Sequence, residues 1–209
     1  MRSLGRAGFT LLELLAVIMI IAVLAAVLVS QLSSGEQATQ ASQTKAFLET
    51  LDHILMEYEL DHGRYPPSSF APDQGVPNDG ENVGIEALVV ALNSNKWNAG
   101  GHEIEADRFG NTDDDVSARS LTDFGNRKLL ELVDPWGNPI AYIYRTDYGV
   151  EDRSYVTIDE QGMEQRATPV AVKDPMKGQY FNHDSFQLIS AGPDCAFNTE
   201  DDIANFANR

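Results

Sequence analysis

The chain has a single cysteine, Cys195, and few basic residues to balance its acids. One cysteine cannot form an intramolecular disulfide, which excludes a disulfide-stapled scaffold. The 209 residues include 15 Lys and Arg against 32 Asp and Glu, which gives a formal charge of −17. Nucleic-acid binding depends largely on Lys and Arg that displace counterions from phosphates, so a nucleic-acid partner is not expected. The length allows one globular domain with an appendage.

The sequence also lacks a recognisable catalytic motif. A nucleophilic role for Cys195 would need a histidine base close to it. The four histidines form no recognisable catalytic motif with this cysteine, and no combination of His, Asp and Ser suggests catalysis. The histidines are His53, His62, His102 and His183. We therefore expect that the protein is not an enzyme.

Basic residues are absent between Arg6 and Lys45, and every position from Leu14 to Val29 is apolar. A helix over residues 9–32 would be about 36 Å long at a rise of about 1.5 Å per residue, enough to cross a bilayer. Arg2, together with Arg6, places the N-terminus in the cytoplasm by the positive-inside rule. The sequence thus predicts a single membrane-spanning segment with the acidic remainder outside the cytoplasm.

A cleaved secretory signal is the main alternative for this segment. The apolar core of such a signal is usually 7–15 residues long, shorter than the run found here. The start of the run also contains Glu13, and an ionisable group at that depth costs about 2–3 kcal/mol on insertion scales. We interpret Glu13 as a functional residue that meets a positive partner.

The residues around this glutamate, Gly8-Phe9-Thr10-Leu11-Leu12-Glu13-Leu14, resemble the processing site of type IV pilins and type II secretion pseudopilins. The resemblance implies that prepilin peptidase removes a cytoplasmic leader, residues 1–8, by cutting after Gly8. It also implies that the new N-terminal residue, Phe9, is methylated to N-methylphenylalanine. Glu13 would then meet the N-terminal amine of a neighbouring subunit and set the register of a filament.

A second helical pattern follows the apolar run. Its apolar positions recur at spacings of three and four, which is typical of an amphipathic helix: Thr44, Phe47, Leu48, Leu51, Ile54, Leu55 and Tyr58. Gly63, followed by Pro66 and Pro67, predicts where this helix ends. The sequence therefore predicts one long helix over about residues 9–61, with bending or local melting in the Gly- and Ser-containing stretch 31–43.

Strands are expected in the second half of the chain. Asp134-Pro135-Trp136-Gly137 fits a type I turn, and three short β-type segments follow at residues 140–144, 155–158 and 186–190. The expected fold is α+β, with the long helix packed on a small antiparallel sheet of these three strands.

Further blocks resemble the major pseudopilins of type II secretion in particular. They occur in the family's order at residues 58–67, 84–88, 134–139 and 188–203. The resemblance implies a periplasmic head over residues 33–209, with insertions at about 90–128 and 147–184.

The chain ends in a segment rich in oxygen ligands. The carboxylates of Asp194, Asp201 and Asp202 would repel one another if the loop closed without a cation, and calcium tolerates such irregular oxygen sets. The spacing is not that of an EF-hand. The pseudopilin resemblance implies structural calcium, bound by these three side chains and by the backbone carbonyls of Ala191 and Thr199. A solvated acidic tail is the alternative.

The acidic stretch 107–115 partly repeats the pattern of the tail. A second calcium loop built from Asp107, Asp114 and Asp115 is one interpretation, but the sequence favours a solvated acidic insertion.

The favoured function is a structural subunit of a type II secretion pseudopilus that drives export of folded proteins. Its expected partners are other copies of itself, prepilin peptidase, minor pseudopilins and the inner-membrane secretion platform. It would span the inner membrane once, with its N-terminus cytoplasmic before assembly and its C-terminal domain periplasmic. The alternatives are a type IV pilin of a surface filament for adhesion or motility, which usually carries a cysteine pair, and a membrane-anchored enzyme.

Overall fold

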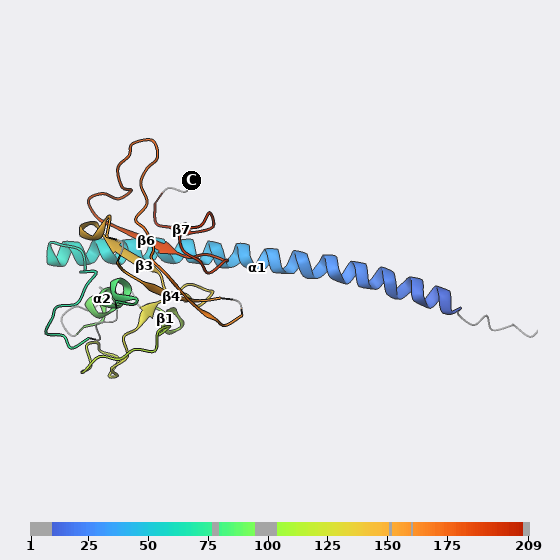
Figure 1. Ribbon diagram of the computed structural model, residues 1–209, viewed down its shortest axis with the longest axis horizontal. Helices are drawn as coiled ribbons and strands as arrows, with labels where there is room; N and C mark the ends of the chain where they lie inside the picture. The colour runs from blue at the N-terminus through green and yellow to red at the C-terminus, as the bar shows by residue number, and fades with distance from the viewer. Residues whose placement is uncertain (1–9, 77–79, 95–103, 151, 160, 207–209) are drawn as a thin grey trace, which may run out of the picture. The chain divides into compact units, whose positions relative to one another are not determined.

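The computed structural model of the chain describes residues 10–76, 80–94, 104–150, 152–159 and 161–206, without side chains at residues 27–34. The chain divides into two compact units, Met1–Thr39 and Gln40–Arg209. Helix α1 (Leu11–His62) contributes to both units, and all other helices and strands belong to the second (Figure 1).

The first unit is the N-terminal part of α1. Every described side chain between Leu11 and Ala26 is exposed, although nearly all of them are apolar. Among the described residues, no helix meets both the length and the apolar character required of a membrane span. The predicted span over residues 9–32 includes Phe9, which lies outside the described residues, and part of the stretch 27–34, whose side chains are not described.

The C-terminal part of α1 confirms the predicted apolar stripe. All seven stripe residues, Thr44, Phe47, Leu48, Leu51, Ile54, Leu55 and Tyr58, are at most 9% exposed. The helix ends where the sequence predicts, because Gly63 adopts a positive φ of 71° and its N–H donates to the carbonyl of Glu59.

The predicted melting within residues 31–43 is wrong, because α1 is helical throughout this stretch. Extending an existing helix adds one hydrogen bond for each residue fixed, whereas a single glycine costs only about 1 kcal/mol relative to alanine. The hydroxyl of Thr39 also donates to the carbonyl of Gly35 at 2.9 Å. One glycine is therefore too weak to interrupt this helix.

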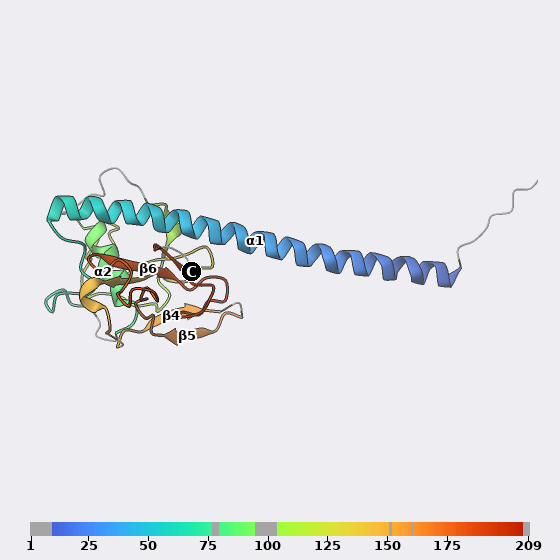
Figure 2. The same ribbon diagram turned by 90° about the horizontal axis from the view of Figure 1, so that it is seen from above.

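The central sheet packs against the C-terminal part of α1 (Figure 2). It has three antiparallel strands in the order β3 (Ala141–Tyr144), β6 (Phe186–Ser190) and β7 (Ile203–Ala204). Tyr142 pairs with Leu188 across β3 and β6, and both side chains belong to the same buried cluster as the α1 stripe. The helix stripe and the sheet thus bury each other, as a two-layer domain requires.

The sheet differs from expectation in one strand. The predicted strand at residues 155–158 is present as β4 (Tyr155–Ile158), but it pairs with β5 (Glu164–Ala167) in a separate hairpin. A tight connection closes this hairpin, since the N–H of Gly162 donates to the carbonyl of Asp159 at 2.9 Å. This local pairing satisfies β4, and β7 takes the third place in the central sheet.

Helix α2 (Val83–Leu92) lies close to strand β3. A side chain at Gly84 would meet the hydroxyl of Tyr155 at 2.5 Å and the carbonyl of Tyr142 at 2.6 Å. Glycine at this position therefore permits the close approach of helix and strand.

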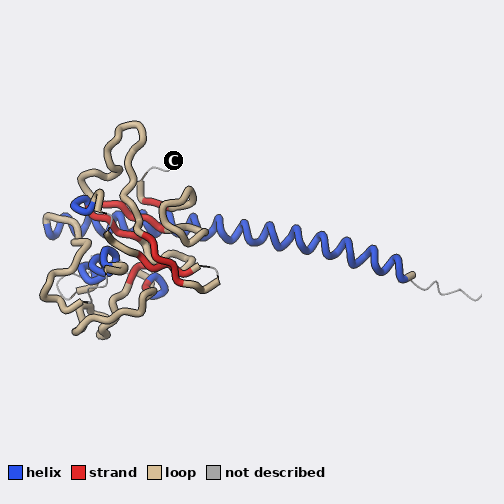
Figure 3. The backbone as a smooth tube through the Cα atoms, viewed as in Figure 1, coloured by secondary structure: helices blue, strands red, loops and turns tan. Residues whose placement is uncertain are grey.

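The remaining elements are short. The 3₁₀-helix η1 (Ala106–Arg108) leads into β1 (Phe109–Gly110), which pairs antiparallel with β2 (Glu131–Leu132), and a second 3₁₀-helix, η2 (Arg145–Asp147), follows β3. Loops connect these pieces and surround the central sheet (Figure 3). Both acidic clusters described below lie in the second unit.

Candidate metal sites and the N-terminal motif

The described chain begins with a capping box at the start of α1. The backbone N–H and the hydroxyl of Thr10 donate to Oε2 of Glu13 at 2.9 and 2.8 Å, and the N–H of Glu13 donates back to the threonine hydroxyl at 3.2 Å. This reciprocal pattern satisfies backbone donors that a helix N-terminus otherwise leaves open. The predicted processing residues Gly8 and Phe9 lie outside the described residues.

The C-terminal loop folds back on itself at Gly192. This residue has a φ of 68°, and a side chain here would come within 2.3 Å of the carbonyl oxygen of Asp201. The backbone therefore brings the first and last parts of the predicted calcium loop into direct contact, which only glycine allows. The predicted carbonyl ligand Ala191 precedes this point and is completely buried.

The three tail carboxylates are held mainly by the loop's own donors. Oδ1 of Asp194 accepts the N–H of Ala196, whereas Oδ2 of Asp201 accepts the N–H of Asp194 at 3.1 Å. The hydroxyl of Thr199 donates to Oδ1 of Asp201 at 2.6 Å. Burial opposes ionisation of Asp201, but these hydrogen bonds outweigh it and lower the pKa of its carboxyl group.

Among the three tail carboxylates, Asp202 is the one with a buried oxygen that accepts no hydrogen bond from the described residues. Its Oδ2 accepts the N–H of Asn198 at 2.9 Å, whereas its Oδ1 is buried and has no hydrogen-bond partner among the described residues. Burial, reinforced by the charges of Asp194 and Asp201, raises the pKa of Asp202 to about 6. The loop therefore carries the electrostatic conflict that its sequence predicts.

Hydrogen bonds fix both flanks of the loop to the rest of the head. Asn198 accepts the N–H of Val170 and donates to the carbonyl of Thr168. At the other flank, Ser190 donates to Oδ2 of Asp134 at 2.6 Å and accepts the N–H of Gly192 at 3.2 Å. The predicted turn at Asp134 is thus joined directly to the start of the loop.

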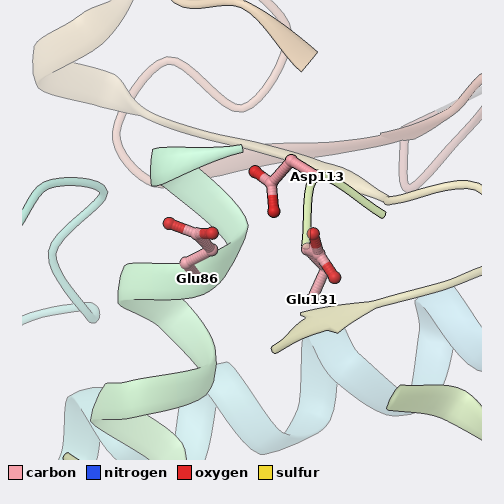
Figure 4. A group of neighbouring side chains, drawn as sticks. All are labelled: Glu86, Asp113 and Glu131. Carbon is pink, nitrogen blue, oxygen red and sulfur yellow. The ribbon is translucent and has the colours of Figure 1, made fainter. Parts of the chain in front are cut away.

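A second acidic cluster lies beside α2, formed by Glu86, Asp113 and Glu131 (Figure 4). Glu86 and Glu131 are buried, and Asp113 is half-buried. Among the described residues, these are the only three acidic, histidine or cysteine side chains whose ligand atoms all lie within 4.8 Å of one another. The tail carboxylates are not that close to one another.

The buried amide of Asn82 connects this cluster. Its Nδ2 is 2.9 Å from Oε1 of Glu131, 3.1 Å from Oδ2 of Asp113 and 2.9 Å from the hydroxyl of Thr112, while its Oδ1 accepts the N–H of Val156. Burial, reinforced by the charge of Asp113, raises the pKa of Glu131 to about 7 despite these donors.

Among the described residues, Asp107, Asp114 and Asp115 of the predicted second calcium loop do not form a group of three acids within 4.8 Å of one another. Asp107 lies in η1 and is exposed, as is Asp114 with its positive φ of 56°. Asp113 is instead the member of this stretch that faces other acids. Sequence reasoning missed Glu86 and Glu131, although each is the only charged residue in an apolar run, which is a signal for a buried acid.

Comparisons with known proteins agree with the N-terminal motif. Residues 4–29 match the family described as the prokaryotic N-terminal methylation motif. The type II secretion system core protein G of Escherichia coli K12 is 26% identical over 206 residues, which cover 95% of this chain and 90% of the relative. The chain is thus similar to a type II secretion core protein G over nearly its whole length.

Two further core G proteins support the same relationship. That of Aeromonas hydrophila is 28% identical over 152 residues, covering 73% of this chain and 82% of the relative. That of Pseudomonas aeruginosa is 27% identical over 143 residues, covering 66% and 73%. No solved structure gives a significant match to this chain.

Proposed function

We propose that the chain is a non-catalytic, membrane-anchored subunit of a type II secretion pseudopilus. The observation that carries this proposal is the methylation motif at residues 4–29 in a chain that matches a core protein G over 95% of its length. The surface-pilin alternative is not favoured, because all three relatives are named as type II secretion proteins.

The proposed processing and assembly of the subunit begin at the inner membrane. Prepilin peptidase cuts after Gly8 and methylates Phe9, and the subunit then joins other copies through α1, with its head in the periplasm. Minor pseudopilins and the inner-membrane platform are its proposed partners. Before assembly, Thr10 of the same chain donates hydrogen bonds to Glu13. On assembly, the methylated amine of a neighbouring subunit replaces Thr10 as the partner of Glu13, and the two opposite charges then meet away from water.

Processing is tested by expressing the full chain with prepilin peptidase and measuring intact mass. We expect loss of residues 1–8 and gain of one methyl group. Gly8→Leu should prevent both changes, whereas Gly5→Ala, a matched change within the leader, should leave them intact. Unprocessed wild-type chain in the presence of active peptidase would contradict the proposal.

Assembly is tested on the same processed material by cross-linking. Glu13→Gln should be processed normally and yet fail to form cross-linked multimers. Glu36→Gln removes another exposed carboxylate from α1 and serves as the control. Equal multimer yields from the two variants would show that Glu13 does not set the register.

We further propose that the C-terminal loop binds structural calcium through Asp194, Asp201 and Asp202, with the carbonyls of Ala191 and Thr199. The unpartnered Oδ1 of Asp202 and the backbone contact at Gly192 support this proposal. The donor set contains only oxygens, which suits calcium.

The calcium proposal predicts a ligand-dependent melting temperature for the full chain in mild detergent. Calcium at a hundredfold excess over its dissociation constant should stabilise the head by about 2.7 kcal/mol relative to chelator. Asp202→Asn should lose the part of this gain that the C-terminal loop supplies, whereas Glu200→Gln, an exposed neighbour in the same loop, should retain all of it. A gain in Asp202→Asn as large as in the wild type would show that the ion does not bind at this loop.

A further inference from the structure

The acidic cluster beside α2 is assembled from three separate parts of the chain. Glu86 belongs to the first turn of α2, Asp113 to the loop after β1, and Glu131 to β2. Their ligand oxygens lie within 4.8 Å of one another. Figure 4 shows the three carboxylates converging on one region between the helix and the strand.

Glu131 has one oxygen that protein donors satisfy and one that they do not. Oε1 accepts hydrogen bonds from the N–H of Thr112 at 2.9 Å, from its hydroxyl at 3.1 Å and from Asn82 at 2.9 Å. Oε2 has no partner among the described residues, although the residue is 0% exposed. The side chain extends from β2 toward Asp113 (Figure 4). A buried acceptor without a partner lowers the stability of the folded state, and lowers it further when the acceptor is charged.

The neighbouring amide does not resolve this conflict. Asn82 has two amide hydrogens, which three acceptors share: the carboxylates of Asp113 and Glu131 and the hydroxyl of Thr112. A neutral amide adds no positive charge to offset the acids. The guanidinium of Arg166 forms its ion pairs with Glu81 and Glu164, and its charge also acts on Asp113 from a greater distance. Arg166 donates no hydrogen bond to Oε2 of Glu131.

We propose that Glu86, Asp113 and Glu131 bind a second divalent cation, calcium, at a site distinct from the C-terminal loop. The donors are all oxygens, which hard cations prefer. Three oxygens that are all within 4.8 Å of one another share a point no more than about 2.8 Å from each, which is close to the calcium–oxygen distance of about 2.3–2.6 Å. Magnesium needs a contraction to about 2.0–2.1 Å with near-ideal octahedral geometry, which fits this cluster less well.

A cation here would join the first predicted insertion to the helix and strand that it contacts. Asp113 is supplied by that insertion, whereas Glu86 and Glu131 belong to α2 and β2. The ion would therefore hold the insertion against the head. This proposal is independent of the secretion function and of the C-terminal calcium loop.

The test is calorimetric titration of calcium into the full chain in mild detergent after removal of bound metal. We expect two binding sites in the wild type. Glu131→Gln, which keeps the size of the side chain, should weaken one of them at least tenfold and leave the other unchanged. Glu164→Gln, an exposed strand carboxylate, is the matched control and should retain both.

The Asp202→Asn variant separates the two calcium proposals. Loss of one site in Asp202→Asn and of the other in Glu131→Gln supports both. A single site that is lost in Glu131→Gln but kept in Asp202→Asn supports this cluster alone. The cluster proposal is overturned if Glu131→Gln binds as much calcium as the wild type. It is also overturned if Glu131→Gln raises the melting temperature of the metal-free protein and leaves calcium binding unchanged. That result would mean that a proton on Glu131, and not a cation, relieves the repulsion among the three carboxylates.

Discussion

At the scale of single residues, Asp134 joins a turn, a strand and the C-terminal loop. Its Oδ1 accepts the N–H groups of Trp136 and Asn138, both at 3.0 Å, and its Oδ2 accepts the hydroxyl of Ser190. Burial is the main cause that raises the pKa of this carboxyl group to about 6, and the hydrogen bonds only partly oppose it. Asp134 therefore accepts several hydrogen bonds, yet its burial still disfavours the charged form of the carboxyl group.

This raised pKa predicts how stability depends on pH. Between about pH 4 and 6 the folded state holds the Asp134 proton more tightly than the unfolded chain, so the group's contribution to stability falls as the pH rises. Asp134→Asn cannot titrate. The variant should therefore gain about 2–3 kcal/mol relative to the wild type across this window, at about 1.4 kcal/mol per pKa unit. Denaturant unfolding of the full chain at pH 4 and pH 6.5 measures this difference.

Glu49→Gln, which removes an exposed carboxylate of α1, controls for the general effect of one charge. A constant free-energy difference between Asp134→Asn and the wild type at the two pH values would contradict the assignment. It would show that the buried carboxyl group ionises as readily as in the unfolded chain.

At the scale of elements, the features that could be predicted from the sequence are those that a local residue pattern determines. The spacing of three and four residues identified the buried face of α1, because a helix repeats over many residues. The turn at Asp134 was also predictable, since Asp, Pro and Gly act through their own backbone preferences. The two residues of β7 carry no detectable alternation, so the third strand of the sheet could not be predicted. Strand β5 is mostly polar and exposed, so no apolar alternation identified it as the local partner of β4.

The buried face of α1 predicts a sharp contrast between two leucines of the same helix. Leu51 is 0% exposed in the core, whereas Leu60 is 84% exposed. Leu51→Ala should destabilise the head by about 2–5 kcal/mol, because it removes packed atoms and leaves a cavity. Leu60→Ala should change stability by no more than about 0.5 kcal/mol.

Denaturant unfolding of the full chain in detergent, followed by tryptophan fluorescence, compares the two variants with the wild type. Equal losses of stability would indicate that the exposed face of α1 is also packed, for example against another copy of the chain.

At the scale of the whole molecule, the acidic cluster shows why some groups of side chains cannot be predicted from the sequence. Glu86, Asp113 and Glu131 have no fixed spacing, and only the fold brings them together. The C-terminal loop was predictable because its acids lie within nine residues of one another and resemble a family pattern. Its calcium remains a prediction.

The formal charge of −17, which becomes more negative when Arg2 and Arg6 are removed with the leader, predicts how assembly responds to salt. Like-charged subunits repel each other over about 30 Å at 0.01 M salt and over about 8 Å at 0.15 M. Multimer formation by the processed chain should therefore increase over this range of sodium chloride. Cross-linking at constant protein concentration measures the response, with Glu13→Gln as the control that should not assemble. Assembly that weakens with salt would show that ion pairs between subunits outweigh the repulsion.

The bonding of Asn82 has a consequence for how this sequence can change. One buried side chain contacts Thr112 and Asp113 of the first predicted insertion, Glu131 of β2 and the backbone of Val156 in β4. An insertion grafted from a relative would deprive the amide and Glu131 of partners unless it carried equivalent groups. These positions should therefore covary, and the insertion should be inherited together with the residues it faces rather than exchanged as an independent module.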